Sequence, residues 1–163
     1  MENAKLVSTH LANHFRLSTS QCSKTVEETK DMSKVLYASA VGCLMYAMVC
    51  TKLDLAHAVS VVSKYMANSG KQHWDAVKWI FRYFKGTIDY DITFVRQKSD
   101  LSIVGYVDAD YARDLDDRRS TTGYVFTLTR RPICWRSMIQ STIAMSTIEA
   151  EYMVAVEVAK KAL

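Results

Sequence analysis

The stretch Ile103-Val-Gly-Tyr-Val-Asp-Ala-Asp110 decides how the second half of this 163-residue chain folds. It is rich in β-branched and aromatic residues, and its side chains alternate between two sides, as is typical of a strand. Two further strands are expected at Gly123–Leu128 and Ile133–Trp135, around a turn at residues 130–132. The sequence therefore predicts a sheet of three antiparallel strands.

Helical spacing returns after these strands. The apolar residues Ala150, Met153, Val154 and Val158 recur at intervals of three or four, with Ser146 or Thr147 as the expected N-terminal cap. No helix-stop signal precedes the last residue, so we expect a sequence that is cut inside or at the end of this helix.

Acidic residues occur in both of these elements. Asp108 and Asp110 are two apart in the first strand and point to the same face, which is costly unless a cation or water offsets their repulsion. Glu149 and Glu151 in the final helix point to nearly opposite sides, so only one of them can face the strand. A strand carboxylate beside a helix carboxylate forms half of a two-metal site, although acidic residues at strand ends and in first helical turns are also common as solvated side chains.

The first half of the chain reads as a polar arm followed by helices. Residues 1–30 are rich in Ser, Thr, Asn and Glu. We expect a helix from Tyr37, a second helix capped by Thr51 and ending before Gly70, and a third over Gln72–Lys85. Alternating residues then begin at Ile92 and Phe94, and we expect a boundary near residues 95–101.

The third helix carries a basic stripe, which we define as Lys71, Lys78, Arg82 and Lys85. Aromatic and apolar side chains line the neighbouring face. Such a stripe can follow a nucleic-acid backbone, but lysine stems also solvate the outer face of many core helices. Arg118 and Arg119, beside the strands, are further candidate phosphate contacts.

Composition limits the class of protein. Hydrophobic residues make up 49% and charged residues 23% of the chain, which indicates a globular fold and excludes disorder by composition. A net charge of +4 permits a polyanionic partner without requiring one. The cysteines lack zinc-ligand spacing, and Cys43 and Cys50 are expected as core thiols. The longest uncharged run, residues 36–51, is shorter than the roughly 18–20 residues of a membrane span, so no membrane partner is expected.

Four motifs in register resemble the ribonuclease H domain that ends the Pol polyprotein of copia-type retrotransposons. They are Gly105-Tyr-Val-Asp-Ala-Asp-Tyr-Ala-Arg-Asp114, Asp117-Arg-Arg-Ser-Thr-Thr-Gly-Tyr124, Trp135-Arg-Ser137 and Ala144-Met-Ser-Thr-Ile-Glu-Ala-Glu-Tyr152. The first half is similar to the segment that joins the reverse transcriptase to that domain, through Tyr37-Ala-Ser-Ala-Val-Gly-Cys-Leu-Met-Tyr46, Asp54-Leu-Ala-His-Ala-Val59 and His73-Trp-Asp-Ala-Val-Lys-Trp-Ile-Phe-Arg-Tyr-Phe-Lys-Gly-Thr87. A plant element is the expected source.

The resemblance implies a division into a polar arm at residues 1–30, a helical reverse-transcriptase tail or connection at 31–98, and a truncated ribonuclease H-like domain at 99–163. The expected fold class is therefore α+β or α/β, a helical segment followed by a partial ribonuclease H-like fold of three antiparallel strands and the first helix. The implied partners are an RNA–DNA hybrid and the reverse-transcriptase domain of the same polyprotein, in an intracellular setting, either cytoplasmic or nuclear.

The resemblance also implies the roles of the carboxylates. Asp108 matches the metal-bridging residue of the first strand, Glu151 before Tyr152 matches the catalytic helix carboxylate, and Asp110 is a neighbouring metal ligand. The implied cofactor is Mg²⁺ in a two-metal site, and the implied activity is hydrolysis of the RNA strand. The family's next metal-binding Asp lies beyond the residues present, so we expect an incomplete site that is inactive alone.

Several residues depart from the family pattern. Leu36, Leu53, Ser69 and Arg113 replace the usual Pro or Gly, and Met138 replaces a frequent Lys. Arg113 matters most, because a Gly beside the site lets backbone approach the substrate whereas a long cation can block it. A nucleic-acid-binding or non-functional remnant of a degenerate element is therefore the alternative interpretation.

Overall fold

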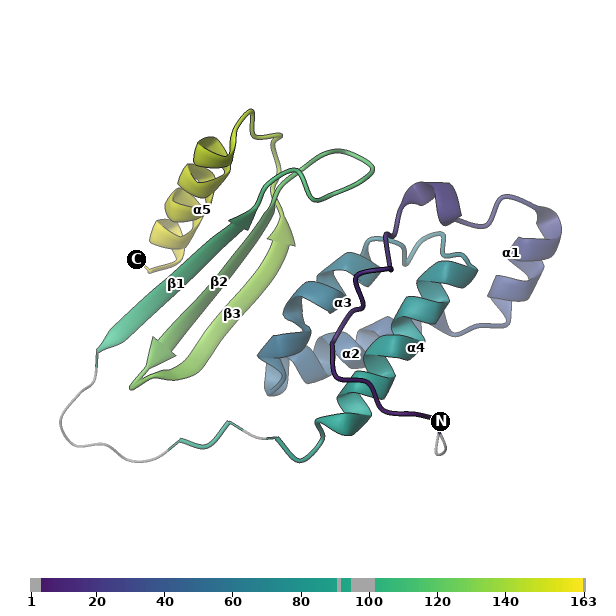
Figure 1. Cartoon of the computed structure of the whole chain (residues 1–163), viewed down its shortest axis with the longest axis horizontal. Helices are drawn as coiled ribbons and strands as arrows, with labels where there is room; N and C mark the ends of the chain where they lie inside the picture. Colours follow the sequence, from purple (N-terminus) through teal and green to yellow (C-terminus); the bar gives the residue numbers. More distant parts are fainter. Residues whose placement is uncertain (1–3, 91, 95–101, 163) are drawn as a thin grey trace. The chain divides into compact units, whose positions relative to one another are not determined.

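The computed structural model describes residues 4–90, 92–94 and 102–162, and it separates the chain into two compact units, Met1–Asp91 and Ile92–Leu163. The first unit is helical, and the second contains an antiparallel sheet and a helix (Figure 1). This arrangement confirms the expected α+β class and is consistent with a partial ribonuclease H-like fold. The boundary expected at 95–101 lies outside the described residues.

The first unit is built from four α-helices and two 3-10 turns among its described residues. They are η1 (Thr19–Gln21), α1 (Val26–Ser33), α2 (Tyr37–Cys50), η2 (Leu53–Leu55), α3 (Ala56–Ser63) and α4 (Lys71–Gly86). The core lies where α2, α3 and α4 meet, and Val41, Leu44, Val59, Val77 and Ile80 are almost completely buried there. Helical spacing of apolar residues places these side chains on inward faces, because residues three or four apart share one side of a helix.

The segment predicted as a polar arm packs against this bundle. Leu17 is buried in the core, and the Trp79 indole donates a 2.9 Å hydrogen bond to the carbonyl of Thr9. In Figure 1 the dark N-terminal trace accordingly runs beside α4. Gly70 permits the closest approach, since a Cβ atom there would lie 1.9 Å from the carbonyl oxygen of Gln21. Three-dimensional packing therefore recruits a segment whose composition is polar.

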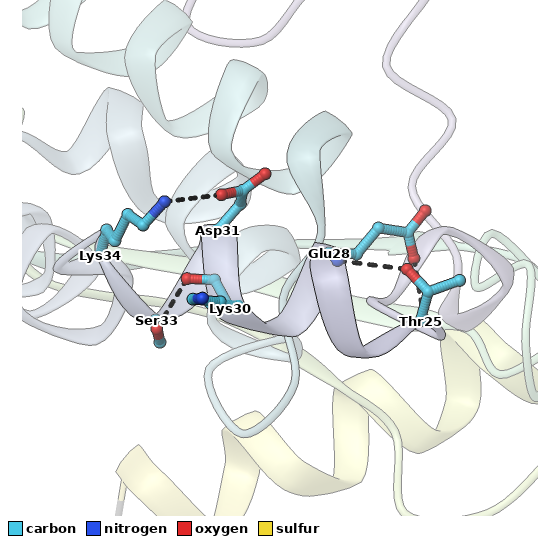
Figure 2. Close-up of polar contacts among 6 residues, drawn as sticks. All are labelled: Thr25, Glu28, Lys30, Asp31, Ser33 and Lys34. Carbon is cyan, nitrogen blue, oxygen red and sulfur yellow. Dashed lines mark hydrogen bonds and ion pairs between the residues drawn. The ribbon is translucent and has the colours of Figure 1, made fainter.

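Helix α1 runs through residue 30, where the sequence predicts the end of the arm. Thr25 caps it, since its hydroxyl accepts a 3.1 Å hydrogen bond from the Glu28 amide while the Glu28 carboxylate accepts one from the Thr25 amide (Figure 2). Hydrogen bonds from the backbone amides of Lys24 and Thr25 lower the pKa of Glu28. Asp31 pairs with Lys34 at 2.8 Å, which lowers the pKa of Asp31. Local capping and charge pairing thus account for a helix with no buried residue.

Three expectations about the first unit are wrong. Thr51 is the C-cap of α2 and not the N-cap of the next helix, because η2 follows and breaks the helical spacing. Helix α3 ends at Ser63, well before Gly70, and turns occupy the intervening residues. Cys43 and Cys50 are exposed, because the core takes the opposite face of α2.

A buried cation closes the C-terminal end of α4. The Lys52 side chain is only 5% exposed, and its ammonium group donates hydrogen bonds to the carbonyl oxygens of Thr87 and Tyr90. Carbonyl groups in the last helical turn lack partners within the helix, and a cation is favourable there because it also interacts with the helix dipole. The contact anchors the chain as it leaves the helical unit.

The second unit consists of β1 (Ile103–Asp110), β2 (Thr121–Leu128), β3 (Arg131–Ile139) and α5 (Thr147–Ala162). The strands pair antiparallel in the order β1-β2-β3. β2 and β3 are longer than the sequence predicts, and the turn lies at Thr129 and Arg130, both with positive φ, as a two-residue hairpin connection requires. Ile92 and Phe94 are irregular, so the strand expected there is absent among residues 92–94.

Within the described ranges, no single helix is long and apolar enough to cross a membrane. Helices α1 and α2, bent by 50°, meet that test only as a pair, by length and composition.

Candidate functional site

The faces of the sheet determine where the strand carboxylates lie. Tyr124, Val154 and Val158 form a small buried core with Ala109 and Phe126, so α5 covers the face that carries Ala109 and Tyr124. Figure 1 shows α5 alongside β1. Because strand side chains alternate, Asp108 and Asp110 lie on the face opposite the one that α5 covers. Burial in this core raises the pKa of Tyr124.

The two candidate carboxylates of α5 have different surroundings. The Glu149 carboxylate accepts a 2.7 Å hydrogen bond from the Met145 amide, and the Ser146 hydroxyl accepts a 3.1 Å bond from the Glu149 amide. Ser146 therefore caps the helix, as expected, and Glu149 completes the cap. Glu151 is exposed and makes no hydrogen bond or ion pair with a residue that the structure describes. Of these two candidates, Glu151 is the one left available for a ligand.

Asp108 and Glu151 belong to segments that share one neighbour. Ala109 pairs with Thr122 across the β1–β2 ladder. The Gln140 side-chain amide donates to the Thr122 hydroxyl at 3.2 Å and to the Ala150 carbonyl at 3.0 Å. Asp108 thus precedes Ala109, which pairs with Thr122. Glu151 follows Ala150, whose carbonyl shares the Gln140 amide with the Thr122 hydroxyl. That a single metal touches both carboxylates stays a prediction.

Asp110, the last residue of β1, has a counter-ion in the loop that follows. Its carboxylate lies 2.9 Å from the Arg113 guanidinium, and both side chains are about half exposed. Arg113 thus supplies the cation that the paired strand carboxylates require. Asp108, by contrast, makes no hydrogen bond or ion pair with a described residue.

The donor set suits one divalent ion of the Mg²⁺ class. Mg²⁺ binds carboxylate oxygens, keeps several waters, and is commonly held by one or two carboxylates plus substrate phosphates. Asp108 and Glu151 supply two such carboxylates, while Asp110 is neutralised by Arg113. Among the described residues, no group of three or more His, Cys, Asp or Glu side chains is arranged to hold a metal. Two carboxylates match the donor number that one such ion requires, and that both reach the same ion stays a prediction.

The basic stripe divides into two kinds of residue. Lys71, Lys78 and Lys85 are exposed, and Lys78 pairs with Asp75 at 2.6 Å. Arg82 is half-buried, donates to the carbonyl of Lys5, and stacks 5.1 Å from the centre of the Trp79 ring. Arg82 therefore holds the N-terminal segment, and the three lysines, seven residues apart, form the exposed line.

The loop after β1 positions the other two arginines. Its backbone is closed by hydrogen bonds between Asp114 and both Arg118 and Arg119. Arg118 is exposed, whereas the Nε atom of Arg119 is buried and makes no hydrogen bond among the described residues. The stripe lies in the first unit and this loop in the second, so the two sets of basic residues belong to separate bodies.

Sequence reasoning missed the role of Gln140. This side chain is 6% exposed and connects the end of β3 to both β2 and α5. No motif in the sequence marks it. The spacing Ser146-x-x-Glu149, by contrast, is a capping signature, and it assigns Glu149 to the helix cap from the sequence alone.

Comparison with known proteins identifies relatives over nearly the whole chain. The chain is 54% identical over 161 residues to the retrovirus-related Pol polyprotein from transposon TNT 1-94 of Nicotiana tabacum, which covers 99% of the chain and 12% of that protein. It is 38% identical to the Pol polyprotein from transposon RE2 of Arabidopsis thaliana, over 93% of the chain and 10% of that protein. The chain therefore spans about a tenth of the length of these polyproteins.

A third relative is shorter. The chain is 44% identical to a protein named secreted RxLR effector protein 161 from Plasmopara viticola, over 81% of the chain and 92% of that protein. No family model and no solved structure matches the chain. The sequence motifs and the two plant polyproteins agree, and homologues of this chain are retrovirus-related Pol polyproteins from plant transposons.

Proposed function

We propose that residues 102–162 are the first part of a ribonuclease H site that hydrolyses the RNA strand of an RNA–DNA hybrid. One observation carries the proposal. Of the four candidate carboxylates, Asp108 and Glu151 have no hydrogen-bond or ion-pair partner among the described residues, whereas Glu149 caps α5 and Asp110 pairs with Arg113. The family resemblance selects the same two residues.

In this proposal Asp108 and Glu151 hold Mg²⁺ through carboxylate oxygens. Asp110 is a more distant ligand, and Arg113 competes with the metal for its carboxylate. Bound Mg²⁺ would activate water and stabilise the charge that develops on the phosphodiester. Two carboxylates offset only half of the charge of two divalent ions, so the chain alone supports one metal well and the second poorly. A further carboxylate is required for full activity.

The partners follow from the same proposal. A hybrid duplex is recognised by its shape and its 2′-hydroxyls, and its phosphates suit the exposed line of Lys71, Lys78 and Lys85 in the first unit. Arg118 is a separate candidate phosphate contact in the second unit. The helical unit would adjoin the reverse-transcriptase domain of the same polyprotein. The setting is intracellular, cytoplasmic or nuclear, because a reverse-transcription intermediate is the substrate. Arg113 in place of the family's Gly favours, as a second candidate, a remnant that binds nucleic acid without cleaving it.

The test is cleavage of a labelled hybrid by a chimaera in which the corresponding downstream segment of the tobacco relative follows residue 163. We expect Mg²⁺-dependent cleavage by the chimaera and no appreciable cleavage by the 163-residue chain. D108N and E151Q should abolish activity. E149Q is the matched control, because Gln also completes a helix cap and should leave activity intact. Metal-dependent cleavage that survives D108N would contradict the site, and binding without cleavage by the chimaera would favour the remnant.

A further inference from the structure

Gln140 links the two segments that carry the proposed metal ligands. Its side chain is buried directly after β3, and its backbone amide donates a 2.9 Å hydrogen bond to the carbonyl of Ser120. The side-chain amide group has two hydrogens, and both find acceptors, the Thr122 hydroxyl and the Ala150 carbonyl. Gln140 is thereby fixed between β2 and the first turn of α5.

Both acceptors lie next to a carboxylate-bearing segment. The Ala150 carbonyl belongs to the planar peptide group that joins Ala150 to Glu151. A hydrogen bond to this carbonyl therefore constrains the orientation of the backbone that leads into Glu151. Thr122 pairs with Ala109, the residue after Asp108. The Gln140 amide therefore joins the Ala150 carbonyl to the Thr122 hydroxyl, and Thr122 pairs with the residue after Asp108.

Such a link is needed because the two carboxylates start from different faces. Alternation directs Asp108 away from the face that α5 covers, so Glu151 must be held at a defined height along β1 to share an ion with it. Burial of Ala150, Val154 and Val158 along one face of α5 sets the rotation of the helix against the sheet. The hydrogen bond to the Ala150 carbonyl adds a fixed point for the height of the first turn.

We propose that Gln140 is a positioning residue that sets Glu151 against Asp108 for metal binding. The inference rests on the proposed function, because it presumes that these two carboxylates hold the ion. Residues that orient metal ligands through hydrogen bonds typically change metal affinity by 10–100-fold when they are replaced. The amide is buried with both hydrogens bonded, while its oxygen Oε1 is buried without a hydrogen-bond partner among the described residues.

The experiment measures Mn²⁺ affinity of the 163-residue chain from the electron paramagnetic resonance signal of free Mn²⁺. Q140M keeps the length and the apolar stem of the side chain but removes both donors, and it should weaken Mn²⁺ binding about tenfold. V158A is the matched control. It loosens the core under α5 without touching the amide, and it should leave the affinity unchanged well below the unfolding temperature.

The outcomes separate the two proposals. A wild-type chain that binds no Mn²⁺ overturns the proposed function, and the role of Gln140 with it. A wild-type chain that binds, together with Q140M of equal affinity or V158A as weak as Q140M, overturns the positioning role alone. If Q140M does not fold by circular dichroism, T122V carries the test. It removes one acceptor, and unchanged affinity in that variant overturns the role.

Discussion

The Arg113 guanidinium and the Asp110 carboxylate lie 2.9 Å apart, so one of the two strand carboxylates already has a cation beside it. The family pattern has Gly where this chain has Arg113, and the ion pair shows what the replacement does physically. It neutralises a carboxylate that would otherwise add to the negative charge around Asp108. A metal that recruits Asp110 must therefore displace Arg113.

Replacing Arg113 should strengthen metal binding. Half-exposed ion pairs contribute roughly 0–1 kcal/mol, so we expect R113G to raise Mn²⁺ affinity by up to about fivefold. R118G is the control, because it removes the same charge from the same loop at a residue with φ of 57°, where Gly is well tolerated. Equal gains in both variants would show that net charge, and not the Asp110 contact, controls the affinity.

The exposed lysines of α4 should control the salt dependence of nucleic-acid binding. If the stripe contacts phosphates, the log–log slope of hybrid affinity against salt should lose roughly 0.9 for each contact removed. We expect the double variant K71E and K78E to flatten the slope in a fluorescence anisotropy titration. A double variant at Lys30 in α1 and at its C-cap Lys34 changes the charge equally, and an identical effect there would mean that the stripe is only a solvated helix face.

Two glycines should respond in opposite ways to alanine. A Cβ at Gly70 would lie 1.9 Å from the carbonyl oxygen of Gln21, so G70A should push the N-terminal segment off α4 and lower the free energy of unfolding by about 1–3 kcal/mol. Gly42 lies inside α2 with nothing within 4 Å of an added Cβ, so G42A should raise the free energy of unfolding by about 0.5–1 kcal/mol. Urea denaturation checks both, and equal stability of G70A and wild type would contradict the close packing of Gln21.

The helical unit should lose stability at alkaline pH. Burial, followed by the hydrogen bond to Asp54, raises the pKa of Tyr83 to about 12, and burial also raises the pKa of Tyr37. When the folded state raises a tyrosine pKa, the protonated hydroxyl stabilises the folded state. This stabilisation is fully present below the unfolded-state pKa of roughly 10 and is lost as pH rises through the folded-state pKa. We expect the urea midpoint to fall between pH 10 and 12, in step with tyrosinate absorbance.

The variant Y83F isolates one of these groups. It removes the titrating hydroxyl that donates a 2.7 Å hydrogen bond to Asp54, so its urea midpoint should fall less steeply over that range than that of the wild type. An unchanged pH profile in Y83F would assign the alkaline loss to Tyr37, whose hydroxyl donates to the carbonyl of Val62.

Local patterns predicted the elements that carry the candidate site. Alternation in residues 103–110 marked β1, and Ser146 marked the start of α5, because a strand pleat and a helix cap depend on residues only two to three positions apart. The spacing Thr25-x-x-Glu28 likewise indicates α1, which the polar composition of residues 1–30 concealed. The end of α3 was misplaced, because several turns follow Ser63 before Gly70.

Contacts between distant residues came only from the tertiary structure. The sequence by itself determined the three strands, the final helix and the four candidate carboxylates. The folded chain decided that Arg82 holds Lys5, that Leu17 enters the core, and that the Gln140 amide joins Thr122 to Ala150. The partners of these groups lie ten or more positions away along the chain. Hydrogen bonds of this kind require atoms to meet within about 3 Å, and the path of the intervening backbone, which no local spacing encodes, sets that distance.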